Sequence, residues 1–396
     1  MTEGDPERTR AWARAAELAY VGGLALGLVI LVVFGFIALR DTVAARNDFT
    51  YAWAGARAFV DGGSPYETAS WLATVRQYQT TPVGDAVFGY PPWVALGLAP
   101  LALLPVAMAS GVWTYGGMLL AALGVRSLLR SVAPGAPVVH FCAGLALFAS
   151  QPGTANVWTG QWSFLLVAAL SVTVVAVRER RPAGLLAAPA LLGKPQLVVL
   201  ALPALVRAAR ALWGPRFAGL FVLPLLVAVA AGWLAFPGWL QAWSAGVPLK
   251  ISSATLGAAE LTAERVATQP PTTLANGLAD LVGPAGPVIA AALVLGLVAA
   301  GLAFHPRSDA FLAVWLAISF ATPLYSFSYD HLTLIVPLVI AAAVAARRSS
   351  RRGTLVAAAG FGFFLIVPSL LYGVADARRN ESFSAFVPLG VALLCL

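Results

Sequence analysis

Charged residues are scarce in this chain: Asp, Glu, Lys and Arg make up 11% of its 396 residues, and 60% are apolar. A soluble domain averages about 25% charged residues, so the composition excludes an ordinary soluble enzyme. Runs of about 20 nearly uncharged residues recur, and each can cross the roughly 30 Å hydrocarbon core of a bilayer as a helix. The alternating segments of about ten residues that form β-barrel strands are missing. We therefore predict an all-α polytopic membrane protein.

Cysteine and histidine are also rare, with two and three residues respectively. Cys142 and Cys395 both lie in apolar segments, which excludes a disulfide framework, and no histidine has cysteine or glutamate neighbours at zinc-binding spacing. The sequence has no Walker motif, no glycine-rich nucleotide loop and no Ser-His-Asp order. These absences predict no metal site and argue against direct use of ATP or a nucleotide sugar.

The basic residues lie in short clusters between apolar runs and give the chain a net charge of +8. Such clusters orient membrane helices, and we predict no nucleic-acid partner. The first cluster contains Arg8, Arg10 and Arg14, and an apolar run over about 19–39 follows it. This run is longer than the apolar core of a signal peptide, which has about 7–15 residues. We expect a cytoplasmic tail over residues 1–18 and a retained first helix.

The most polar and aromatic-rich part of the chain follows this helix, over about residues 40–90. We predict that it is the first outer loop and contains two interfacial helices, because Trp and Tyr prefer the membrane interface. The run Gly62-Gly63-Ser64-Pro65 should end the first of them, and the second should cover about 67–79. The loop closes with the rigid run Phe88-Gly89-Tyr90-Pro91-Pro92.

The apolar run over about 91–107 poses a topological question. If it and the next run, about 110–130, both crossed the membrane, the basic cluster Arg178-Glu179-Arg180-Arg181 would lie outside, against the positive-inside rule. Four prolines interrupt the 91–107 run, which is typical of a broken segment that packs against protein. We therefore expect a re-entrant or interfacial helix there.

About twelve membrane spans are then predicted within a single domain over residues 1–396, with a second outer loop over about 236–283. No internal repeat is visible. Two of the segments, 183–193 and 195–207, are too short to cross a bilayer and should form half-depth helices that meet at Lys194. The twelve segments are about 19–39, 110–130, 136–150, 157–177, 183–193, 195–207, 217–235, 284–304, 309–323, 331–346, 354–374 and 384–396.

On this topology the unusual polar residues converge on the outer face. Asp48, next to Phe49 and near Tyr51, can act as a general base for an acceptor hydroxyl, since burial beside aromatic side chains would raise its basicity. It can equally be a solvated helix cap or a partner of Arg46. We predict contacts with a sugar or an acceptor for Tyr51, Asp85, Tyr90, Gln161 and Asp330.

Two cations are candidates for binding a phosphate. Lys194 lies between two apolar half-helices, where a charge is costly without a partner, so it either extends toward the interface or binds an anionic head group. His331 follows Asp330 at the start of a predicted helix. The two can form a capping pair, or the imidazole can bind a phosphate leaving group with help from the helix dipole. Gln161 can orient sugar hydroxyls or bridge helices.

Several short motifs follow one another along the chain. They are Asp48-Phe49, Ala54-Gly55, Asp61-Gly62, Pro65-Tyr66, Phe88-Gly89-Tyr90-Pro91-Pro92, Gly160-Gln161, Lys194-Pro195 and His331. In order and spacing they resemble glycosyltransferase family 87, bacterial integral membrane enzymes of the GT-C superfamily. The resemblance covers about residues 20–375. One departure is Ser163, where the family usually has Asn shortly after the Gly-Gln pair.

The resemblance implies a GT-C-type bundle and an inverting transferase in the bacterial plasma membrane. It implies a polyprenyl-phosphate-linked sugar as donor, most often mannose and in some members arabinofuranose. The acceptor would be a lipid-linked glycan on the outer face, and membrane lipids the other partners. Asp48 would be the catalytic base, and Lys194 and His331 would bind the donor phosphate. No cofactor is required; a divalent metal is compatible with the mechanism but not needed, because one carboxylate and cations suffice.

Two other functions fit a polytopic membrane protein. A transporter or flippase of lipid-linked sugars predicts inverted repeats and broken helices with charges at the midplane; Lys194 fits that pattern in part. A scaffold or accessory subunit without activity would tolerate replacement of Asp48 by asparagine, whereas the enzyme would not.

Overall fold

All regular secondary structure is helical in the part of the chain that the computed structural model describes, residues 6–38, 48–78, 86–246, 272–323, 325–378 and 381–396. The predicted all-α class is therefore confirmed. In chain order the helices, with 3₁₀-helices labelled η, are α1 (Pro6–Ala38), α2 (Asp48–Val60), α3 (Thr68–Gln77), α4 (Pro92–Ala102), α5 (Val106–Val132), α6 (Pro137–Ala149), α7 (Gln151–Thr159), α8 (Ser163–Glu179), η2 (Pro182–Gly193), η3 (Pro195–Leu197), α9 (Ala201–Trp213), α10 (Pro215–Ala235), α11 (Trp239–Gly246), α14 (Leu274–Val282), η5 (Gly283–Ala285), α15 (Gly286–Leu302), α16 (Asp309–Ala321), η6 (Ser328–Leu334), α17 (Ile335–Arg348), α18 (Ser350–Arg378), η7 (Ser382–Ala385) and α19 (Phe386–Cys395).

Six stretches of the described residues are helical, long and apolar enough to cross a membrane, or seven if the bent pair α7 and α8 forms one span. This confirms a multi-pass helical membrane protein, while the total of twelve spans stays a prediction. Large apolar side chains on these helices face outward, including Leu119 (60% exposed), Leu226 (60%) and Leu295 (69%). Apolar side chains so exposed need a lipid environment. The six stretches are Thr9–Val33, Val106–Val132, Pro215–Ala235, Leu274–Leu302, Ser328–Arg348 and Ser350–Val374.

α1 is 33 residues long and begins at Pro6, well before the predicted start near residue 19. The extra turns are rich in Ala, Glu and Arg, which are strong helix formers, so the apolar run marks only the membrane part of this helix. α1 packs closely along α6, where a Cβ at Gly23 would lie 2.3 Å from the Phe141 carbonyl oxygen. Small residues allow such close packing of membrane helices.

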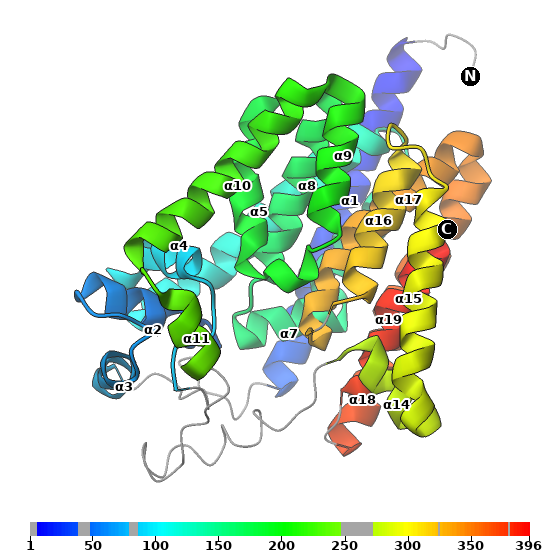
Figure 1. The fold of residues 1–396 in the computed structure, drawn as a ribbon. Helices are drawn as coiled ribbons and strands as arrows, with labels where there is room; N and C mark the ends of the chain where they lie inside the picture. The colour runs from blue at the N-terminus through cyan, green and yellow to red at the C-terminus, as the bar shows by residue number, and fades with distance from the viewer. Residues whose placement is uncertain (1–5, 39–47, 79–85, 247–271, 324, 379–380) are drawn as a thin grey trace.

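Two helices of the first outer loop are present as predicted. α2 ends at Val60, just before the Gly62–Pro65 turn, and α3 corresponds to the second predicted helix. Figure 1 shows α2, α3 and α11 at one end of the bundle, together with α7, and the start of α1 at the other end. These elements make that end a surface of short helices and connections.

α4 is shorter than a full membrane span. Its 11 residues extend about 16 Å, roughly half the thickness of the hydrocarbon core. It is tied to its surroundings by two indoles: Trp53 Nε1 donates to the Leu101 carbonyl at 3.2 Å, and Trp93 Nε1 donates to the Leu192 carbonyl at 2.8 Å. These bonds show that α4 packs against protein; its re-entrant or interfacial position stays a prediction.

A sharp corner of 119° separates α7 from α8. Gly160 caps α7 with φ 62°, in the left-handed region, and its N–H donates to the Asn156 carbonyl at 2.9 Å. Glycine adopts this conformation without a steric penalty. The corner places Gln161 against Asp48 at the start of α2, and Trp162 against Trp113, which stacks on Phe49 of α2.

A second break occurs at Lys194, as predicted, between η2 and η3. The helix that follows, α9, begins at Ala201 rather than near residue 195. Prolines at 182, 189 and 195 remove backbone donors, and the segment before the break is a 3₁₀-helix. Lys194 therefore sits in irregular backbone buried within protein, where such backbone is tolerated at membrane depth.

Ion pairs join the helix ends at the opposite end of the bundle. Arg126 and Arg130 contact Glu17 at 2.7 and 2.5 Å, and Arg178 and Arg347 both contact Asp309 at 2.7 Å. Basic residues from α5, α8 and α17 thus share one end of the molecule, which is the arrangement that the positive-inside argument requires.

Candidate active site

Asp48 is the first residue of α2 and lies against the α7–α8 corner. Its Oδ2 accepts a hydrogen bond from Gln161 Nε2 at 2.5 Å, across 113 residues of sequence. The side chain keeps partial exposure to solvent, so a substrate hydroxyl can reach it. Gln161 therefore joins the α7–α8 corner to α2, as one reading of the sequence predicted. The residue that it contacts on α2 is the candidate base, Asp48.

The surroundings of Asp48 raise its pKa above the ordinary value for an aspartate. Burial is the main cause; the hydrogen bond from Gln161 and the positive charge of Lys194 act in the opposite direction and only partly offset it. A raised pKa makes the ionised carboxylate a stronger base. Lys194 is thus near enough to act on Asp48 electrostatically, although it belongs to a distant part of the sequence.

Lys194 is buried and paired. Its Nζ donates to Asp330 Oδ1 at 2.6 Å, and the two side chains are 6% and 2% exposed. The ammonium also lies 4.6 Å from the centre of the Tyr329 ring, a favourable cation–π position. The side chain therefore does not extend to the interface, and the partner that a charge at this depth requires is Asp330.

Asp330 is fixed by further bonds within the protein. Its Oδ2 accepts from the Phe327 N–H at 3.1 Å, and Ser163 Oγ donates to Oδ1 at 3.4 Å. Ser163, where the resembling family usually has Asn, thus contacts the partner of Lys194. Contact of Asp330 with a sugar stays a prediction.

His331 is 2% exposed, and neither of its ring nitrogens has a hydrogen-bond partner among the described residues. The structure therefore shows no side-chain capping bond from this imidazole. Buried polar nitrogens nearly always have a partner, so the ring nitrogens of His331 have hydrogen-bonding capacity that the described residues do not use. Its role in binding phosphate stays a prediction.

An aromatic row connects α2 to the corner. The Phe49 ring stacks on Trp113 with centroids 5.3 Å apart, Trp113 meets Trp162 edge-on at 4.7 Å, and Trp162 lies 6.2 Å from Tyr90. Trp113 Nε1 also donates to the Gly160 carbonyl at 2.9 Å. Sequence reasoning missed Trp113, because a tryptophan near the end of an apolar run carries no signal beyond interface preference.

Tyr51 and Tyr90 occupy different positions. The Tyr51 hydroxyl donates to the Val87 carbonyl at 3.1 Å and accepts from the Gly89 N–H at 2.6 Å, so it holds the end of the first outer loop. Burial raises the pKa of Tyr90 above its ordinary value, and the nearby carboxylates of Asp48 and Asp330 add to the effect. Tyr90 therefore borders the candidate site.

Three predicted contacts with sugar or acceptor thus lie around Asp48, namely Gln161, Tyr90 and Asp330, while Tyr51 supports the loop behind them. Asp85 lies outside the described residues, as does Arg46. All assignments of these residues to a sugar or an acceptor stay predictions.

Asn156 is a further polar residue that the sequence did not single out. Its Nδ2 donates to the Tyr329 and Pro152 carbonyls, both at 2.7 Å, and its Oδ1 accepts from the Ser163 N–H at 3.2 Å. It therefore joins α7, α8 and η6 and fixes the corner against the segment that carries Asp330. The only feature of the sequence that could have singled out Asn156 is its position four residues before Gly160, the glycine that caps α7.

Glu381 is a second carboxylate near this network. Its Oε2 accepts from the Ser328 N–H at 3.3 Å, and Gln151 Nε2 donates to Ser328 Oγ at 3.3 Å. Burial raises the pKa of Glu381, the Ser328 bonds lower it, and Asp330 raises it further. Glu381 comes after α18, far along the chain from every motif that the sequence analysis used.

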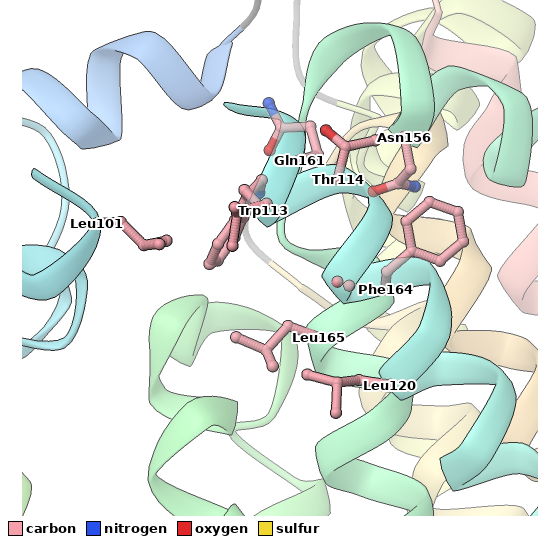
Figure 2. A pocket seen from close by; sticks show the side chains of 11 residues that line it. Leu101, Trp113, Thr114, Leu120, Asn156, Gln161, Phe164 and Leu165 are labelled. Atoms are coloured by element: carbon pink, nitrogen blue, oxygen red, sulfur yellow. The ribbon is translucent and has the colours of Figure 1, made fainter. Parts of the chain in front are cut away.

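A cavity of about 210 Å³ opens beside Gln161, between α5 and α8 (Figure 2). Asn156 and Gln161 lie at one end of it, and Leu120 and Leu165 at the other. Such a cavity suits an elongated molecule with a polar end and an apolar tail. Its lining residues are Leu101, Val112, Trp113, Thr114, Gly116, Gly117, Leu120, Asn156, Gln161, Phe164 and Leu165.

Among the described residues no group of three or more His, Cys, Asp or Glu side chains could hold a metal ion. What the site offers instead is a carboxylate of raised basicity, a buried ammonium, an unpaired imidazole and an apolar cavity. This combination can take a proton from a hydroxyl at one point and stabilise negative charge at another.

Comparison with known proteins gives one match. The family model described as glycosyltransferase family 87 matches residues 88–326, which is more than half of the chain and includes Tyr90, the α7–α8 corner and Lys194. No curated protein and no solved structure matches the chain significantly.

Proposed function

The chain belongs to glycosyltransferase family 87, and we propose that it transfers a sugar from a polyprenyl-phosphate donor to a lipid-linked glycan, on the outer face of the bacterial plasma membrane and with a GT-C arrangement. Mannose is the first candidate for the sugar. The observation that carries the proposal is the meeting of Asp48 with Gln161, within electrostatic reach of the buried Lys194. Such a site provides a base and a cation without a nucleotide-binding loop.

In the proposed reaction Asp48 takes the proton from an acceptor hydroxyl. The hydroxyl oxygen attacks the anomeric carbon, and the bond from that carbon to the phosphate oxygen breaks with its electron pair on the phosphate. Attack from the face opposite the leaving group inverts the anomeric configuration. Gln161 holds the carboxylate in place, and its free Oε1 can accept from a sugar or acceptor hydroxyl.

The leaving phosphate gains negative charge in the transition state, and donors that bind it there lower the barrier. Lys194 has three N–H donors, of which Asp330 occupies one. His331 has ring nitrogens without a described partner. The two side chains can therefore bind phosphate oxygens without giving up an existing contact.

The cavity beside Gln161 is proposed to hold the start of the donor's polyprenyl chain. A Cβ at Gly116, which lines this cavity, would meet nothing within 4 Å, so Gly116→Leu should fill space without disturbing α5. We expect KM for a long-chain donor to rise about tenfold, which corresponds to the burial of roughly two methylene groups. A short-chain donor analogue should be affected less.

The matched control is Gly111→Leu, also on α5 and also free of neighbours within 4 Å, but not on the cavity. Equal KM values for Gly116→Leu and Gly111→Leu with the long-chain donor would remove the cavity from the donor site.

The hydrogen bond from Gln161 lowers the pKa of Asp48, so Gln161→Ala should raise that pKa further. Transfer requires ionised Asp48, and the acidic limb of the kcat/KM profile should therefore move to higher pH, by about one unit for the loss of a charge-assisted bond. Gln241→Ala, at an exposed position on α11, is the control. A limb that stays in place or moves to lower pH would contradict the role of Gln161.

Donor class can be tested with purified protein and a total membrane lipid extract as acceptor. We expect labelled sugar to be transferred from polyprenyl-phosphate mannose and not from GDP-mannose. Transfer from polyprenyl-phosphate arabinofuranose alone would keep the donor class and change the sugar. Transfer from GDP-mannose alone would refute the proposal.

A further inference from the structure

A second cavity, of about 500 Å³, lies at the opposite end of the bundle from Asp48. It is formed where α8 ends and where α9 meets α10, at the end where α1 begins in Figure 1. Its lining residues are Arg180, Pro182, Trp213, Pro215, Arg216, Phe217 and Leu220. None of the motifs used above falls in it.

Two guanidinium groups line this cavity, and no carboxylate does. Arg180 ends α8 with φ 56°, and its guanidinium carbon lies 5.7 Å from the centre of the Trp213 ring. Arg216 lies in the first turn of α10. Within the described part of the chain, neither arginine forms an ion pair or hydrogen bond with another side chain.

Neighbouring arginines differ in this respect. Arg178, two residues before Arg180, is paired with Asp309 at 2.7 Å, and Arg181, the next residue, is paired with Glu179 at 2.7 Å. The two arginines of the cavity thus lie beside two arginines that have carboxylate partners, while they form no such pair within the described residues. Arginine stays charged at any physiological pH, so the cavity holds two positive charges and attracts an anion.

The cavity continues onto the lipid-facing surface. α10 belongs to the candidate membrane spans, and Leu220, which lines the cavity, is 51% exposed; Leu223, one turn further, is 55% exposed. A free phosphate ion would use only the arginines. A phospholipid would use the arginines for its phosphate and the Leu220 surface for its acyl chains. Basic pockets between membrane helices bind anionic lipid head groups in this way.

We propose that this cavity binds the phosphate head group of an anionic phospholipid from the leaflet at that end of the bundle, with its acyl chains along α10. The site is separate from the Asp48 site and does not depend on the donor assigned above. Trp213 closes one side of the head-group position and holds Arg180 in place. α9 follows Lys194 and η3 in the chain. A lipid bound where α9 meets α10 would therefore stabilise the helix that follows the buried lysine.

Native mass spectrometry of the full chain, titrated with phosphatidylglycerol or phosphatidylcholine, tests the proposal. We expect the wild type to retain phosphatidylglycerol in preference to phosphatidylcholine. Arg180→Gln with Arg216→Gln should weaken retention about 30-fold, from the attraction that two basic residues exert on an anionic lipid. The control, Arg351→Gln with Arg352→Gln, removes two exposed arginines from α18 outside the cavity and should change it little.

Arg180→Gly is a second variant that keeps the fold, because glycine suits the left-handed φ at this position. It should weaken retention about fivefold. Glycerol phosphate in excess distinguishes a head-group site from a site that needs acyl chains, and we expect it to displace little phosphatidylglycerol. Equal retention by wild type and both cavity variants, equal binding of phosphatidylcholine, or full displacement by glycerol phosphate would overturn the proposal.

Discussion

Asp48→Asn is expected to reduce sugar transfer by about 10²–10⁴-fold, the usual contribution of a general base, while leaving the fold intact. Asparagine has the shape of aspartate, and Gln161 can turn its amide so that its Oε1, which has no partner at present, accepts from the new Nδ2. The loss should fall on kcat rather than on KM, because the missing interaction is made in the transition state. Initial rates with purified protein measure both.

The stability of Asp48→Asn should not fall together with its activity. The pKa of Asp48 is raised in the folded protein, so folding favours the protonated carboxyl, and this contribution is lost as pH rises through the folded-state pKa. Above the folded-state pKa the ionised carboxylate is unfavourable, so there Asp48→Asn should have an unfolding temperature equal to or above that of the wild type. Below the ordinary pKa of an aspartate the carboxyl is protonated in both states, and the difference should vanish.

The control for this variant is Asp61→Asn, whose carboxylate pairs with Arg57 on the exposed side of α2. Such a surface pair contributes little, so both transfer and stability should stay close to the wild type. Wild-type rates for Asp48→Asn would remove Asp48 from the reaction, as the scaffold alternative requires. A large fall in unfolding temperature for this variant would instead give it a structural role.

The second large effect is expected at the buried pair of Lys194 and Asp330. Lys194→Met or Asp330→Asn alone leaves one charge buried without its partner, and each should cost about 3–5 kcal/mol of stability. The double variant removes both charges, and it should cost much less than the sum of the two single changes. Denaturation of the four proteins in detergent measures this coupling.

Transfer activity distinguishes a structural pair from a phosphate-binding one. If Lys194 binds the leaving phosphate, the double variant should recover stability but not transfer, since no ammonium remains at the site. Recovery of both would make the pair purely structural. Additive stability losses would contradict the 2.6 Å contact itself.

Sequence patterns were sufficient for the elements of this fold that depend on local chemistry. The prolines around Lys194 predicted one of the two breaks that build the site, because proline limits the backbone directly. The break at Gly160 was missed: the predicted span over about 157–177 runs through it, whereas α7 ends at Thr159 and α8 begins at Ser163. The first outer loop yielded its two helices, and the prolines of the 91–107 run indicated a broken segment, which the short helix α4 matches. The start of α1 was wrong, because hydropathy detects the membrane boundary and not the end of a helix.

The assembly of the site was less accessible from sequence. A lysine at that depth needs a partner, but several carboxylates were available at the same end of the bundle, and the choice of Asp330, 136 residues away, depends on how the helices pack. The same applies to Trp113, Asn156 and Glu381, whose contacts are all long-range. The candidate base was identified because its position after a helix and among aromatics is a local property.

The most direct test of the account uses purified wild-type protein in proteoliposomes with polyprenyl-phosphate mannose, labelled at the anomeric carbon, and a membrane lipid acceptor. We predict that free polyprenyl phosphate and mannosylated lipid form in equal amounts, with the anomeric configuration inverted and with both products missing for Asp48→Asn. Movement of the intact donor across the bilayer without cleavage, or equal product from wild type and Asp48→Asn, would contradict it.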